Sequence, residues 1–287
     1  MDPLLDAARR FAAYEEDGAS APGSPHLSRT REEHAKIIGR TGSLTAIDAG
    51  SALIARRSNA AFGVVKTVSL LATHPGFTFE DRRWIVSVAS ERNYMVRMVC
   101  VETGEEREAI LAASHAGVLR DPDSGIDLAR ALLERDLQSR ARGLVLADGS
   151  LAARIPEERA VCERIPESVL GIVKRPSLVR PRAPEMIAQR FAEPVFAHRI
   201  DDAWYCRLHP ASALIVRIEG VLDEDRFDAL LLACSDAAIP GYPYALVLAD
   251  RFARISTREA RSLALESAAR FGLAVGSLHD VLDSLER

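Results

Sequence analysis

Two aspartates follow short, largely apolar runs that lie a hundred residues apart in the chain. Residues 144–147 lead into Asp148, and residues 44–47 lead into Asp48, with Gly and Ser close behind each acid. Each run is too short for a helix and is closed by turn residues, which predicts a core strand ending in a tight bend. An acid at the end of a buried strand is held still beside a cleft. We therefore expect Asp48 and Asp148 to share one site.

A third acid falls on a predicted helix over residues 127–142. Its apolar stripe consists of Ala129, Leu132, Leu133 and Leu137, and Glu134 lies at the edge of this stripe. From that position the carboxylate can reach a cleft while the helix stays docked. The alternative is an ion pair with a neighbouring arginine at the surface.

Carboxylates gathered in a cleft repel one another, by roughly 4 kcal/mol for two unit charges about 4 Å apart at an effective dielectric of 20. Such a cluster persists by protonation or by holding a cation. Magnesium and manganese prefer oxygen ligands, and a pair of such ions can stabilise the attacking and leaving oxygens of a phosphodiester. Asp48, Glu134 and Asp148 are the candidate ligands. The scattered histidines and cysteines show no zinc-site spacing.

A cation follows another predicted strand. Residues 168–173 end in Lys174, one of only three lysines in the chain, and a cation at the end of a core strand suits a phosphate. The alternative is a solvated strand end. Residues 175–190 contain four arginines and three prolines, which predicts a basic, irregular segment able to follow a phosphate backbone.

The order of these motifs resembles that of the NurA family of DNA-repair nucleases. The set comprises AIDAGS at 46–51, the helical Glu134, LADGSL at 146–151, GIVK at 171–174 and GYPY at 241–244. The match spans residues from about 44 to 260.

The resemblance implies an RNase H-like core that binds manganese or magnesium and acts on DNA ends as a nuclease. It implies that Asp48, Glu134 and Asp148 are metal ligands, that Lys174 faces phosphate and that Tyr242 lines the site. It further implies a homodimer docked on a hexameric HerA-type ATPase, the translocase that feeds DNA during end resection.

The chain departs from the family pattern in two places. Asp250 stands where family members commonly place a His, and a carboxylate can ligate a hard metal but cannot act as the same proton donor at neutral pH. The first motif reads Asp-Ala-Gly-Ser, in which we expect Gly50 to supply a flexible turn. The third ligand could also be Asp136, Glu106 or Glu108. With these departures, a catalytically weak or inactive adaptor that clamps DNA or regulates the translocase is the alternative function.

The elements that must position these residues indicate an α/β fold. Closely spaced strands at 44–48, 52–55, 61–71, 84–89 and 94–101 predict an antiparallel meander within a mixed sheet flanked by helices. We expect helices at 105–116 and 225–234, a hairpin at 204–208 and 213–219, and a last helix to about 271, opened by a capping box of Ser256 and Glu259.

Two domains are expected. An N-terminal helical segment covers residues 1–40, with helices at 2–16 and 30–38 around a loop at 18–28, and a nuclease domain covers 41–287, with a short helix after 272.

Composition narrows the function classes. The 287 residues include 37 Lys and Arg against 41 Asp and Glu, so a net charge of −4 gives no overall attraction to nucleic acid or to an anionic membrane. The four separate cysteines and the lack of a long apolar run predict a cytoplasmic protein with no membrane contact. A phosphotransferase of the actin-like class would need a nucleotide site, for which no Walker A or GxGxxG signal is present.

Overall fold

The structure is a computed structural model that describes residues 25–38, 43–57, 59–73, 76–90, 93–111, 122–174 and 191–271. The predicted helices at 2–16 and after 272, and the basic segment 175–190, lie outside these residues. No helix within the described ranges is long and apolar enough to cross a membrane.

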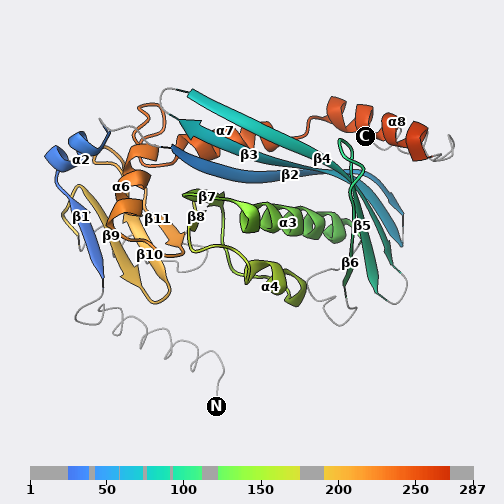
Figure 1. The fold of residues 1–287 in the computed structure, drawn as a ribbon, viewed down its shortest axis with the longest axis horizontal. Helices are drawn as coiled ribbons and strands as arrows, with labels where there is room; N and C mark the ends of the chain where they lie inside the picture. The colour runs from blue at the N-terminus through green and yellow to red at the C-terminus, as the bar shows by residue number, and fades with distance from the viewer. Residues whose placement is uncertain are drawn as a thin grey trace, which may run out of the picture.

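The first half of the sheet is the predicted antiparallel meander (Figure 1). It consists of β2 (Ser43–Arg57), β3 (Ala60–Thr73), β4 (Gly76–Ser90), β5 (Tyr94–Cys100) and β6 (Glu106–Leu111). The long helix α3 (Asp123–Arg140) then returns the chain to the other side of β2, where β7 (Val145–Asp148) and β8 (Val169–Val173) pair in parallel. Five antiparallel strands followed by two strands parallel to β2, with a helix crossing between the two groups, make the mixed α/β sheet that was expected.

The second half of the sheet continues beyond β8 with antiparallel strands. β11 (Val216–Glu219), β10 (Ala203–Arg207), β9 (Val195–Ile200) and β1 (His26–Arg29) complete an eleven-stranded sheet among the described residues. The hairpin of β10 and β11 was predicted, whereas β9 was not, and β1 occupies residues predicted as loop. β1 is a strand because Ser28 pairs opposite Phe196 of β9, a partner that the local sequence does not reveal.

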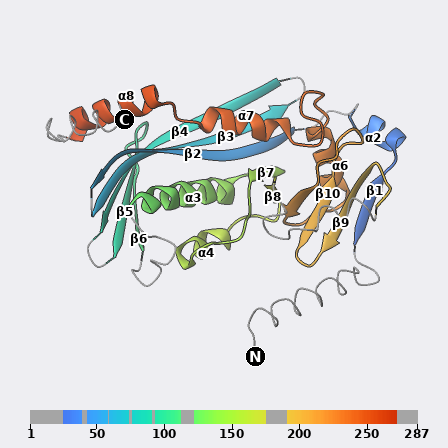
Figure 2. The same cartoon turned by 180° about the vertical axis from the view of Figure 1, so that it is seen from behind.

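Helices cover both faces of the sheet (Figures 1 and 2). α3 and the short α4 (Pro156–Cys162) lie on one face, and α7 (Tyr244–Ala253) and α8 (Thr257–Phe271) lie on the other, while α2 (Arg31–Ile38) and α6 (Glu224–Ala233) pack together beside β1. Ala46 and Leu146 join the core beneath α7, and their neighbours Ile47 and Ala147 join the core beneath α3. Side chains alternate along a strand, so Asp48 and Asp148 point toward the α7 side.

The predicted helix at 105–116 is wrong in the described part, because residues 106–111 form strand β6. Arg107 and Ala109 are partly buried, while Glu106, Glu108 and Ile110 are exposed. This alternation is the strand period, and β6 is held by antiparallel pairing with β5. A charge-rich run with good helix propensity is therefore overridden by tertiary pairing.

The predicted break between strands at 44–48 and 52–55 is also wrong. β2 runs without interruption through Asp48 and Gly50, so Asp48 lies within a strand and Gly50 is not in a turn. Gly50 is required for another reason: a Cβ there would lie 2.2 Å from the carbonyl oxygen of Ala253, at the end of α7. Glycine at this position lets α7 approach the strand that carries Asp48.

Substitution of Gly50 tests this close contact. Gly50→Ala forces the backbone of α7 away from β2, and we expect it to lower the free energy of unfolding by about 2 kcal/mol or more, measured by urea denaturation. Gly76→Ala is the matched control, because nothing lies within 4 Å of a Cβ at that strand position, and it should change stability by less than about 0.5 kcal/mol. Equal stability of the two variants would contradict the contact.

Candidate active site

The site opens where β7 ends and β2 continues. Ile47 pairs with Ala147 in the parallel register, so Asp48 and Asp148 occupy corresponding places on adjacent strands. Neighbouring strands of a sheet lie about 4.8 Å apart. Beyond this point β2 has no β7 partner. The N–H of Ala49 donates instead to Asp48 Oδ1 at 2.8 Å, and its carbonyl accepts from Arg130 Nη1 of α3 at 3.3 Å. Side chains thus replace the missing strand beside the two aspartates.

Glu134 reaches this opening from α3 and is buried, with 7% of its surface exposed. Gln138 Nε2 donates to Glu134 Oε1 at 3.0 Å, and Arg130 Nη1 lies 3.5 Å from Glu134 Oε2. The expected alternative of an arginine partner is therefore present, but the pair is not a surface pair. Both helical partners stand one turn from Glu134, at i−4 and i+4.

Two carboxylates of the site, Asp48 and Glu134, have raised pKa values. Burial is the main cause that raises the pKa of Asp48 to about 6, and the negative charges of Asp148 and Asp250 add to it. Burial likewise raises the pKa of Glu134 to about 7. The negative charges of Asp48 and Asp148 also raise it, while the positive charges of Arg130 and Arg135 oppose them. Four acids from β2, α3, β7 and α7 therefore share one electrostatic environment.

Lys174 and Tyr242 surround Asp148. Lys174 Nζ lies 2.6 Å from Asp148 Oδ2, and the Tyr242 hydroxyl donates to Asp148 Oδ1 at 3.4 Å. The ammonium group also lies over the Tyr242 ring, 5.1 Å from its centroid. Burial and the charge of Asp148 raise the pKa of Tyr242, which keeps its hydroxyl a hydrogen-bond donor.

Asp250 stands at the margin of the site on α7. Its Oδ2 accepts from Arg254 Nη2 at 2.7 Å, one helical turn away, while its charge acts on Asp48. The helix is held against β2 by the close contact of Ala253 with Gly50. A cation at Asp48 would therefore be within electrostatic reach of Asp250.

The other acids considered for the third position lie elsewhere. Asp136 forms ion pairs with Arg107 of β6 at 2.8 Å and with Arg140 at 2.9 Å. Glu106 and Glu108 project from β6 beside Arg97, with more than half of each side chain exposed. None of these three is among the main influences on the pKa values of Asp48 and Glu134.

The carboxylate oxygens of the site are of the type that a hard divalent cation binds. In the described part of the chain, no three His, Cys, Asp or Glu side chains are already arranged as a metal-ligand set. The cations Lys174 and Arg130 instead contact Asp148 and Glu134, where they balance carboxylate charge. Magnesium and manganese prefer carboxylate oxygens as ligands. Two of the carboxyl groups at this site, those of Asp48 and Glu134, have raised pKa values.

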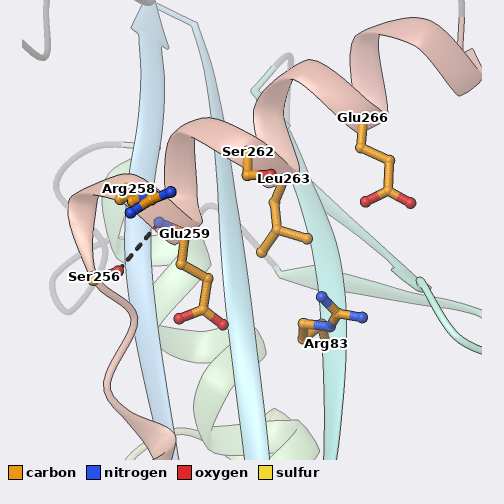
Figure 3. Close-up of a pocket in the computed structure, with 7 residues that line it drawn as sticks. All are labelled: Arg83, Ser256, Arg258, Glu259, Ser262, Leu263 and Glu266. Atoms are coloured by element: carbon orange, nitrogen blue, oxygen red, sulfur yellow. Dashed lines mark hydrogen bonds between the residues drawn. The ribbon is translucent and has the colours of Figure 1, made fainter.

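A separate pocket of about 300 Å³ lies between β4 and α8 (Figure 3). Its lining includes Arg83, Arg258, Glu259 and Glu266, and it contains none of the four acids described above. Ser256 Oγ at its rim accepts from the N–H of Glu259 at 3.1 Å, as the capping-box prediction requires. The pocket is distinct from the carboxylate site.

The sequence did not identify several residues of the site. Arg130 and Gln138 could have been found from their one-turn spacing to Glu134 on the helix. Arg135, on the same helix, and Glu219, at the end of β11, gave no local signal, because their partners lie in the loop after Asp148.

No protein-family model and no curated protein matches the chain. Among solved structures, the chain is similar to the NurA nuclease from Sulfolobus solfataricus, with 14% identity over 94% of this chain and 95% of that one and a TM-score of 0.45. It is similar to NurA bound to dAMP and manganese, at 9% identity, 90% and 93% coverage and a TM-score of 0.48. Ciona intestinalis endonuclease V with an inosine-containing DNA matches at 10% identity, 75% and 86% coverage and a TM-score of 0.39.

Removing the Glu134 charge should change how stability depends on pH. The pKa of Glu134 is raised on folding, so the folded state binds the extra proton between about pH 4.5 and 7, and metal-free stability falls as pH rises through that window. A shift of this size corresponds to at most about 3 kcal/mol. Glu134→Gln should therefore raise stability at pH 8 relative to wild type and leave it nearly equal at pH 4.5, measured by urea denaturation with a chelator present. Asp136→Asn, from the same helix, should keep the wild-type slope. If the stability of Glu134→Gln depended on pH as that of wild type does, the raised pKa of Glu134 would be refuted.

Proposed function

We propose that this protein is a divalent-metal-dependent DNA nuclease whose manganese or magnesium is held by Asp48, Glu134 and Asp148, with Asp250 as a further ligand. The observation that carries the proposal is the convergence of these carboxylates from four separate elements on a largely buried site, where burial first and the neighbouring negative charges second raise the pKa values of Asp48 and Glu134. Such an arrangement is costly without a counter-charge. A bound cation would offset the repulsion among the carboxylates, and this gain in free energy would favour binding of the metal.

The bound ion would supply Lewis-acid activation of a phosphodiester and of the attacking water. The chain's own cations take part around it. Lys174 Nζ lies 2.6 Å from Asp148 Oδ2, and the same ammonium group could hold a phosphate oxygen if Asp148 served as a metal ligand. Tyr242 retains its proton and can donate a hydrogen bond to the same region. These two residues orient the scissile phosphate.

DNA is proposed as the substrate because phosphate-binding cations stand beside the acids. The net charge of −4 gives no general attraction to a polyanion, so binding depends on local groups such as Lys174, Arg130 and Arg254. The motif resemblance to NurA nucleases supports the finer assignments: action on DNA ends in double-strand break resection, a homodimer, and a hexameric HerA-type ATPase as partner.

An adaptor without catalysis is the second candidate function. It is favoured by the ion pairs that already satisfy two of the acids, Lys174 with Asp148 and Arg254 with Asp250. An adaptor would clamp DNA with the same cations but would not need a metal. Calorimetric titration of the purified chain with manganese separates the candidates, since absence of binding at millimolar metal favours the adaptor.

The nuclease proposal is tested with end-labelled linear DNA and manganese, with and without the ATPase partner. Asp48→Asn and Asp148→Asn should each lower the rate of degradation at least about a hundredfold, because each removes several kcal/mol of charge stabilisation around the metal. Asp136→Asn is the matched control and should retain activity within about threefold. Circular dichroism of each variant checks the fold. Wild-type activity in either site variant would refute the ligand assignment.

A further inference from the structure

A chain of hydrogen bonds connects β11 to the loop that follows Asp148. Glu219, the last residue of β11, is buried, with 8% of its surface exposed. Both of its carboxylate oxygens accept from Ser150 Oγ at 2.9 Å, and Oε2 also accepts from the N–H of Leu151 at 2.7 Å. β8 lies between β11 and β7 in the sheet. Glu219 therefore holds the Asp148 loop from across an intervening strand.

The same loop is held on its opposite side by α3. Arg135 Nη2 donates to the carbonyl of Ser150, and its Nη1 donates to Gln138 Oε1 at 2.9 Å. Gln138 is fully buried, and its Nε2 donates to Glu134 Oε1 at 3.0 Å. Arginine can only donate, so it fixes the amide with its oxygen toward Arg135 and its NH₂ toward Glu134.

The loop itself leaves little room for adjustment. Gly149 has φ of +100°, which favours glycine, and a Cβ on Gly171 would lie 2.7 Å from the Gly149 carbonyl oxygen. The backbone next to Asp148 is thus packed against β8 while Glu219 and Arg135 bind the next residue. The position of Asp148 is therefore set by the contacts that the residues directly after it make.

We propose that Gln138, Arg135 and Glu219 are positioning residues that hold Glu134 and the Asp148 loop in a fixed relation to each other, and that this network raises the affinity of the two carboxylates for a divalent cation. The inference rests on the proposed function and deepens it. The three side chains join two proposed ligands that come from different elements, α3 and β7, through one continuous set of hydrogen bonds. None of the three is itself a proposed ligand of the cation.

The energetics of buried polar groups favour a positioning role for this network over a role in stability alone. A buried polar network is retained at a desolvation cost, and well-packed apolar side chains often stabilise a fold as well. Partners that orient metal ligands typically change metal affinity or activity by about 10–100-fold when they are removed. Disrupting the network should therefore lower the affinity of the site for the metal.

Gln138→Met tests the proposal, because methionine keeps the approximate volume and removes both hydrogen bonds of the amide. We expect manganese affinity, measured by calorimetry, to fall about 10–100-fold. Degradation of linear DNA should recover to within about threefold of wild type at saturating manganese. This split between affinity and maximal rate is not expected from a loss of stability alone.

Glu158→Gln is the matched control. Glu158 is equally buried, on α4, and accepts from the backbone N–H of Arg154 at 3.0 Å, but no contact links it to Glu134 or Asp148. It should bind manganese as wild type does. Glu219→Gln is the second network variant and applies if Gln138→Met does not fold: a single amide oxygen cannot accept all the bonds of the Asp148 loop, so manganese affinity should fall about tenfold.

Wild-type manganese affinity in a folded network variant would overturn the positioning role and leave the nuclease proposal standing. An equal loss in Glu158→Gln would also overturn it, since the effect would then belong to any buried polar change. Failure of the wild-type chain to bind manganese would overturn the proposed function, and this inference with it.

Discussion

Repulsion among carboxylates that the fold brings together is the constraint around which the rest of the site is arranged. Asp48 and Glu134 are nearly removed from water, and both have raised pKa values, first because they are buried and second because acids on other elements face them. Without a metal, the charge is balanced by protons, by Lys174 on Asp148 and by Arg130 on Glu134. The same cations are the groups that a phosphate would recruit once another positive charge takes their place. The resting state and the proposed working state therefore use the same side chains in different pairings.

Acids from both faces of the sheet can meet because two neighbouring strands, β7 and β2, differ in length. β7 stops at Asp148, while β2 extends to Arg57. A continuous β7 would separate the two faces of the sheet along its whole length. Because it ends, Glu134 from the α3 face comes within electrostatic reach of Asp48, and Arg130 takes the place of the missing strand at the carbonyl of Ala49. On the α7 face, Gly50 admits the helix that carries Asp250.

Much of the fold followed from patterns in the sequence. Strands β3, β4, β5, β7 and β8 and helices α2, α3, α6 and α8 were predicted, because buried strands and amphipathic helices carry their period in a few neighbouring residues. The failures share one cause. β6 was predicted as a helix, β1 as a loop and β2 as two strands, and each was decided by a partner: β5 for β6, β9 for β1 and β3 for the continuous β2. Strand identity at such positions depends on pairing rather than on propensity.

The sequence by itself determined the chemistry available: two aspartates after apolar runs, a helical glutamate, a lysine after a core strand, and a tyrosine and an aspartate eight residues apart near the end of the chain. Residue type and local period are properties of a short segment, so a short segment can reveal them. Only the tertiary structure decided that Asp48 lies inside a strand, that Lys174 rests on Asp148, and that Gln138, Arg135 and Glu219 tie Glu134 to the Asp148 loop. The physical reason is that burial, which raises these pKa values and makes each hydrogen bond matter, exists only once segments distant in the sequence have packed together.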